Sequence, residues 1–249
     1  MGDVSTLPNG LTVVYDEVGT GLPFVLLHGF PHNRSLWAPQ TSALLEHGRC
    51  IAPDLRGFGE SGRQGPYSME QYAEDVIELL ATLGIDRAVV GGLSMGGYVA
   101  FAIWRAKPQL VRALVLADTR PGADSPDARR KRMELIALAK ASGAGAVANA
   151  QISGMVGATT RAQNPALVDG LHQMLAGAPV EGVIGAHAPS GTGYERRRDE
   201  GDRCPRSERS GIPIALVARA HTRGHIRARP AKRPRRSASA AGGRAGGRL

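Results

Sequence analysis

Gly92-Leu93-Ser94-Met95-Gly96 lies between a strand-like and a helix-like segment, and this placement sets the expected architecture of the chain. The apolar run Ala88-Val89-Val90 before it predicts a buried strand, and a helical pattern continues from Met95 to Ala106. A sharp turn between them needs glycines two residues either side of the serine, because larger side chains would collide. We predict that the Ser94 hydroxyl is a nucleophile at a helix N-terminus, where developing negative charge is favoured. A turn used only for packing or anion binding is the alternative.

Strand-like and helix-like segments alternate on both sides of this motif. Apolar runs predict further strands at Leu11–Val14, Phe24–Leu27, Cys50–Ala52 and Ala113–Ala117. Ser68 and Gln71 predict a capping box for a helix that ends at Gly84. Strands separated by helices imply an α/β fold with a mainly parallel sheet flanked by helices. We assign residues 1–119 to this core.

The rest of the chain divides into two parts. Residues 120–186 contain helix starts at Ser125-Pro126 and at Pro165 and no strand pattern, which predicts a helical insertion. Residues 187–249 carry 16 basic and 5 acidic side chains, whereas residues 1–186 carry 15 basic and 17 acidic ones. The last segment is poor in large apolar side chains, so we expect it to be disordered.

Two loops are predicted to lie beside the serine turn. His28-Gly29-Phe30-Pro31 follows a predicted strand, and its glycine would let the next amide turn inward. The N–H groups of Phe30 and Met95 would then form an oxyanion hole with two donors. The second loop, Asp54–Ser61, is polar and rich in glycine, and alone it would be an ordinary turn.

In this order and spacing, the serine motif and the two loops resemble the α/β-hydrolase family over about residues 8–186. The segment from Val89 to Arg120, with the insertion after it, looks most like the enol-lactone hydrolases that act on 3-oxoadipate lactone and related esterases. The resemblance implies the α/β-hydrolase fold, with residues 120–186 as a cap that selects the substrate. It also implies hydrolysis of an ester or lactone by Ser94, a histidine and a carboxylate. Ser94 stands where the dehalogenase branch carries a carboxylate.

The C-terminal part departs from the family pattern and predicts an incomplete or irregular end of the fold. Family members carry the acid after the seventh strand and the histidine some two dozen residues later. Ile212–Val217 looks like that strand, but no carboxylate follows Glu208, and His225 lies only eight residues beyond the strand. His221 or His225 therefore stays open as the base. Asp118, directly after an earlier strand, stays open as the acid, although a turn or capping role also fits it.

Three hypotheses account for this end of the chain. A frameshift after about residue 186 would produce the abrupt change to Arg, Gly, Ala and Pro, and another reading frame would then restore the family pattern. The second hypothesis is an active enzyme with relocated acid and base. The third is a basic arm for nucleic acid, but Tyr194 is the one aromatic residue there, so stacking on bases is nearly absent. We therefore predict an impaired enzyme; a non-catalytic ligand-binding protein of the same fold is the alternative.

Composition narrows the expected setting. No apolar run approaches the roughly 18 residues of a membrane span, and the N-terminus lacks a secretory pattern, so we expect a cytoplasmic protein without membrane contact. Cys50 and Cys204 do not predict a disulfide framework. His28 and His32 are spaced like a metal pair but lie in a loop, so no metal site is predicted. We expect a small-molecule ester or lactone as partner, without a metal or organic cofactor and without nucleic acid.

Overall fold

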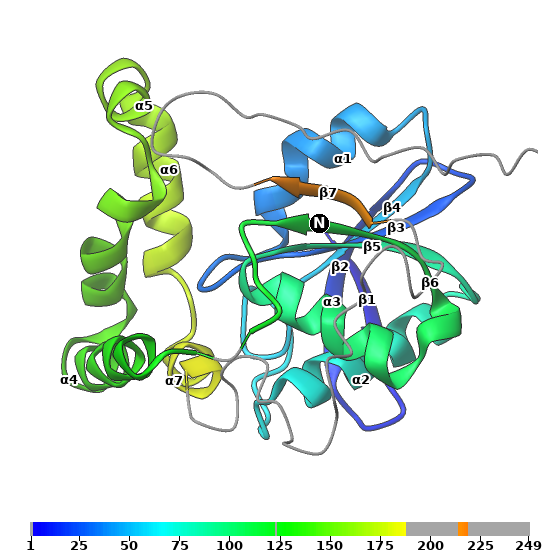
Figure 1. Ribbon diagram of the computed structural model, residues 1–249, viewed down its shortest axis with the longest axis horizontal. Coiled ribbons are helices and arrows are strands. Elements are labelled where there is room, and N and C mark those ends of the chain that lie inside the picture. The colour runs from blue at the N-terminus through cyan, green and yellow to red at the C-terminus, as the bar shows by residue number, and fades with distance from the viewer. Residues whose placement is uncertain (1, 123, 188–213, 219–249) are drawn as a thin grey trace, which may run out of the picture.

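A seven-stranded sheet runs through the centre of the computed structural model, which describes residues 2–122, 124–187 and 214–218 (Figure 1). In chain order the strands are β1 (Asp3–Thr6), β2 (Thr12–Val18), β3 (Pro23–Leu27), β4 (Arg49–Pro53), β5 (Ala88–Leu93), β6 (Val111–Ala117) and β7 (Ile214–Ala218). Across the sheet their order is β1-β2-β4-β3-β5-β6-β7. The β1–β2 and β2–β4 pairs are antiparallel and the other four pairs are parallel, so the sheet is mainly parallel, as predicted.

The central strands form because their apolar runs can be covered on both faces. Val25 in β3 pairs in register with Ile51 in β4 and with Val90 in β5, and all three side chains are fully buried. The sequence analysis missed β1, because its residues alternate between exposed and buried positions without an apolar run. This strand pairs with β2 at the edge of the sheet.

Helices cover both faces of the sheet (Figure 1). The core contains η1 (Arg34–Trp37), α1 (Ala38–Leu44), α2 (Met69–Thr82), α3 (Met95–Ala106) and η2 (Pro108–Leu110). Helix α1 lies on one face, and α2 and α3 lie on the other. Apolar side chains such as Leu79 in α2 and Ile103 in α3 are fully buried, and each contributes about 1.5–3 kcal/mol through burial. The fold class is therefore α/β, as predicted.

The start of α2 differs in one detail from the predicted capping box. The Ser68 hydroxyl accepts a hydrogen bond from the Gln71 N–H at 3.1 Å, as expected. The Gln71 side chain instead donates to Asp75 at 3.3 Å, because that carboxylate lies one helical turn further on. At the other end Gly84 has φ +68°, the left-handed conformation that ends a helix.

A group of helices follows β6 and lies beyond the ends of β5 and β6 (Figure 1). It comprises α4 (Pro126–Met155), α5 (Ala158–Gln163), α6 (Pro165–Ala176) and α7 (Val180–His187). Within α4, Gly143 has φ 75° and ψ −177°, so two helical segments meet there at a kink. Helices thus occupy the segment predicted as a helical insertion.

The described part of the C-terminal region is β7, which pairs in parallel with β6. A strand was predicted at Ile212–Val217, and the structure has it at Ile214–Ala218. The predictions of disorder after residue 187, and of an altered C-terminus, otherwise fall outside the described residues. Within residues 2–122, 124–187 and 214–218, none of the helices combines the length and the apolar character that crossing a bilayer requires.

Candidate active site

Ser94 lies in the turn between β5 and α3 with a backbone conformation that side chains rarely adopt. Its φ is 49° and its ψ is −107°. Although Ser94 is the N-cap of α3, its side chain makes no capping hydrogen bond, so the hydroxyl is not used to complete the helix. The residue is half-buried. Strained residues held in place by their surroundings cluster at functional sites, and this one carries a hydroxyl.

Two glycines make this turn sterically possible. A Cβ atom on Gly92 would lie 2.2 Å from the carbonyl oxygen of Gly96, and one on Gly96 would lie 2.2 Å from the carbonyl oxygen of Leu27. Both obstacles are backbone atoms, so no side-chain rotation could relieve the clash. The glycines therefore allow α3 to start directly against the end of β3.

The loop His28-Gly29-Phe30-Pro31 packs against this turn. A Cβ atom on Gly29 would lie 3.2 Å from the carbonyl oxygen of Leu93, which is the residue before the serine. The Phe30 ring meets the Phe58 ring edge to face, with 6.1 Å between centroids. Because β3 and β5 are parallel neighbours, the Phe30 backbone and the N-terminus of α3 lie at the same edge of the sheet.

His28 is fully buried and joins the loop after β3 to the loop after β4. Its Nε2 accepts a hydrogen bond from the Leu55 N–H at 3.0 Å, and its Nδ1 lies 2.9 Å from the Gly29 carbonyl oxygen. An accepting Nε2 places the proton on Nδ1, so the neutral ring donates to Gly29. Burial lowers the pKa of His28 to about 4. Both ring nitrogens are engaged, so His28 has a structural part in this arrangement.

His32 is nearly buried in the same loop, at 7% exposure. Its Nδ1 has no hydrogen-bond partner among the described residues. Burial, and next the neighbouring His28, lower the pKa of His32 to about 4. Among the residues that the structure describes, no group of three or more His, Cys, Asp or Glu side chains is placed to hold a metal ion.

The end of β6 lies directly beside the serine turn. Leu93 pairs in register with Ala117, so Ser94 and Asp118 follow paired residues at the same edge of the sheet. The Ser94 N–H donates to the Ala117 carbonyl oxygen at 2.9 Å. Asp118 is exposed and has φ 42°, and it shares the left-handed region with Ser94 alone among the described non-glycine residues. The structure thus brings these two predicted residues to neighbouring strand ends.

Known proteins share both the sequence pattern and the fold. The sequence model of the alpha/beta hydrolase fold matches residues 23–140. The structure of a thermophilic esterase from Thermogutta terrifontis, with malate bound, is 37% identical in sequence and superimposes with a TM-score of 0.72. That match covers 77% of this chain and 72% of the esterase. This chain belongs to the α/β-hydrolase family.

Other relatives place the chain among varied α/β-hydrolases. The enol-lactonase from Burkholderia xenovorans LB400 is 27% identical, with a TM-score of 0.70 over 77% of this chain and 74% of the lactonase. The soluble epoxide hydrolase of Corynebacterium sp. (strain C12) is 40% identical over 115 residues, which are 46% of this chain and 40% of that protein. The chain thus spans about two fifths of the curated relatives it matches. The predicted resemblance to lactonases and esterases is confirmed.

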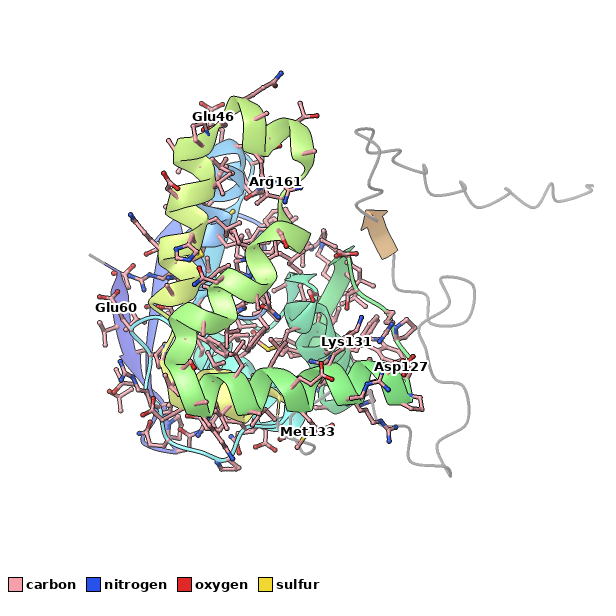
Figure 2. All side chains as sticks on the ribbon, turned by 90° about the vertical axis from the view of Figure 1, so that its left-hand side faces the viewer. Glu46, Glu60, Asp127, Lys131, Met133 and Arg161 are labelled. Carbon is pink, nitrogen blue, oxygen red and sulfur yellow. The ribbon has the colours of Figure 1, made fainter. Side chains whose placement is uncertain are left out.

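The helices after β6 lie at the edge of the sheet where this α/β-hydrolase carries Ser94 (Figure 1). Figure 2 views them from outside, with Asp127, Lys131 and Met133 along α4. These three side chains are exposed, and Met133 is 53% exposed. The outer side of this helical segment is therefore mixed polar and apolar.

A buried carboxylate secures the start of α4. Asp124 accepts hydrogen bonds from Arg120 at 2.9 Å and from Arg132. Burial alone would raise the pKa of Asp124, but the two guanidinium groups outweigh it and hold this pKa below its usual range. The connection from β6 to the helical segment is thus fixed by a charged contact.

Two supporting contacts of this hydrolase site escaped the sequence analysis. The Thr119 Oγ1 donates to the Ser94 carbonyl oxygen at 2.9 Å. The carboxylate of Asp54, fully buried, accepts from the backbone N–H groups of Arg34 at 2.7 Å and Glu60 at 2.9 Å, and it also binds the Arg34 guanidinium. Burial raises the pKa of Asp54, opposed by these contacts. No local pattern signals these pairs, because Arg34 and Asp54 are 20 residues apart.

His221 and His225, the candidate bases, lie outside the described residues. Glu208, the last carboxylate of the chain, also lies outside them. Asp118 is therefore the one candidate of the predicted acid and base that the described part of the chain contains.

Proposed function

We propose that this chain is a serine hydrolase site for a carboxylic ester or lactone, with Ser94 as the nucleophile. The observation that carries the proposal is the Ser94 backbone at φ 49° and ψ −107°, in the turn between β5 and α3. A serine that only packed or capped a helix would have no reason to hold this conformation. The strain is explained if the turn presents the hydroxyl to a substrate.

The proposed reaction begins with attack of the Ser94 hydroxyl oxygen on the substrate carbonyl. The N–H groups of Phe30 and Met95 stabilise the oxyanion of the tetrahedral intermediate. The Met95 N–H belongs to the first turn of α3, whose N–H groups have no partner within the helix. Loss of the alcohol leaves an acyl-enzyme, which water hydrolyses. No metal or organic cofactor takes part in this scheme.

A histidine must take the proton from Ser94 and later deliver it to the leaving alcohol. We propose His221 or His225 for this part, and Asp118 as the acid beside it. His28 does not suit the part, because its Nε2 already accepts from Leu55. A missing or misplaced base costs on the order of 10⁶ in kcat. We therefore expect turnover well below that of a complete serine hydrolase.

The relatives support the proposal by their own descriptions. Two solved structures similar to this chain are an esterase and an enol-lactonase. Epoxide hydrolase and haloalkane dehalogenase are also among the similar proteins, so the family alone indicates only hydrolysis. The serine at position 94 favours ester or lactone chemistry, because a hydroxyl attacks a carbonyl carbon to form an acyl-enzyme.

Covalent labelling tests the proposal. A fluorophosphonate reacts with an activated serine, so we expect it to modify the full chain at Ser94, as located by mass spectrometry of peptides. Ser94→Ala should abolish both the labelling and any hydrolysis of p-nitrophenyl butyrate. Labelling that persists in Ser94→Ala, or no labelling of a folded wild-type chain over many hours, contradicts the proposal. Ester binding without labelling would indicate a non-catalytic ligand-binding protein instead.

A further inference from the structure

Ser94 is held on both sides by one short turn, Ala117-Asp118-Thr119, at the end of β6. The Ser94 N–H donates to the Ala117 carbonyl oxygen at 2.9 Å. The Ser94 carbonyl oxygen accepts from the Thr119 Oγ1, also at 2.9 Å. These two bonds flank the Cα atom of Ser94, so together they restrain its φ and its ψ.

The fit of Thr119 is steric as well as polar. A Cβ atom on Gly97 would lie 2.4 Å from the Thr119 Cγ2 and 2.5 Å from its Oγ1. The threonine side chain therefore occupies the space that the missing side chain of Gly97 leaves on the first turn of α3. This contact brings the hydroxyl within reach of the Ser94 carbonyl oxygen.

The turn is itself strained at its central residue. Asp118 has φ 42°, a left-handed conformation that Asp and Asn tolerate better than most residues. The bend at Asp118 lets the carbonyl group before it and the hydroxyl group after it both point at Ser94. The two strained non-glycine residues of the described chain are thus linked through their neighbours.

We infer that the turn 117–119 is a clamp that keeps Ser94 in its strained conformation, and that Thr119 is a positioning residue for the nucleophile. The assignment of Thr119 rests on the proposed role of Ser94. The clamp itself does not, because it concerns only the backbone. The Ser94 carbonyl oxygen also accepts from the N–H groups of Gly97 at 3.0 Å and Tyr98 at 3.3 Å. Those bonds come from α3, whereas Thr119 alone ties this oxygen to the neighbouring strand.

Thr119→Val and Thr119→Ser separate the hydrogen bond from the packing. Valine keeps the branched shape and loses the donor, whereas serine keeps the donor. Each is combined with Ser94→Gly, because glycine adopts the left-handed conformation without strain. In the wild type and in Thr119→Ser, Ser94→Gly should raise the melting temperature by roughly 2–4 °C. In Thr119→Val that gain should fall to less than half, because an unclamped Ser94 has already relaxed.

Equal gains from Ser94→Gly in all three backgrounds would overturn the clamp. The positioning role has its own readout, the limiting rate of fluorophosphonate labelling at saturating reagent. It should fall about 10-fold to 100-fold in Thr119→Val, with reagent affinity unchanged, and recover in Thr119→Ser. Equal limiting rates in the two variants would overturn the positioning role while the proposed function stands. No labelling even of the wild type would overturn the proposed function and this role with it, and the melting comparison would still decide the clamp.

Discussion

At the scale of single residues, the candidate site depends on backbone conformations as much as on side-chain chemistry. Ser94 and Asp118 are neighbours at the ends of β5 and β6, and both have positive φ values. For Ser94 the strain is compatible with presenting a nucleophile. For Asp118 two explanations compete, a catalytic carboxylate and a residue that merely tolerates the bend of the turn.

Asp118→Asn distinguishes the two explanations, because Asn also tolerates the left-handed conformation and has nearly the same shape. The Asp118 side chain is exposed and has no hydrogen bond to another described residue, so we expect the variant to change Ser94 labelling by less than about threefold. The measurement is the labelling rate beside the melting temperature. A loss of about 10⁴-fold with an unchanged melting temperature would instead identify Asp118 as the acid of the triad.

At the scale of elements, two glycines fix how closely α7 packs on the core. A Cβ atom on Gly182 would lie 1.9 Å from the carbonyl oxygen of Gly57, in the loop after β4. One on Gly185, nearly one turn later, would lie 2.2 Å from the Tyr67 ring. Since helix residues three apart share a face, the glycine side of α7 lies directly against this loop. The close contact joins the helical segment after β6 to the core.

Substitution of alanine for glycine should therefore have opposite effects in two neighbouring helices. Gly182→Ala forces α7 away from backbone atoms that cannot rotate aside, and we expect a loss of about 1–3 kcal/mol in the free energy of unfolding. Gly170 in α6 has open space where its Cβ would lie, so Gly170→Ala should gain about 0.5–1 kcal/mol from helix propensity. Urea denaturation measures both. If Gly182→Ala is as stabilising as its control, the contact between α7 and the loop is looser than described.

At the scale of the whole molecule, the two buried histidines make stability depend on pH. The pKa values of His28 and His32 are lowered to about 4 by burial, below the ordinary value of 6.5. Between about pH 6.5 and pH 4 the unfolded chain therefore binds protons that the folded chain does not bind. The free energy of unfolding should fall as the pH drops through this window, by up to about 1.4 kcal/mol per pH unit for each histidine.

His32→Leu tests this dependence at one position. The Nδ1 of His32 is buried without a partner among the described residues, so an apolar side chain of similar size removes an unsatisfied group. We expect the variant to be more stable than the wild type, by a margin that grows as the pH falls from 6.5 to 4. Urea denaturation at pH 7.5 and pH 5 measures the two margins. Equal margins would mean that His32 titrates alike in the folded and unfolded chains.

Much of the architecture could be predicted, because it depends on local patterns. Apolar runs located the strands from β2 to β6, the bounds of α3 were predicted at Met95 and Ala106, and a strand was expected where β7 lies. Ser94 was singled out because two glycines flank it between a strand and a helix. The edge strand β1 and the kink at Gly143 were missed, since neither breaks or makes an apolar period.

The sequence by itself determined the fold class, the mainly parallel sheet and the serine turn, because each follows from patterns within some ten neighbouring residues. Only the tertiary structure decided that the turn 117–119 grips Ser94, that His28 ties two loops together, and that Asp54 is buried against Arg34. These contacts join residues about 20 or more positions apart. Their partners are chosen by which strand ends meet at one edge of the sheet, and no local period encodes that choice.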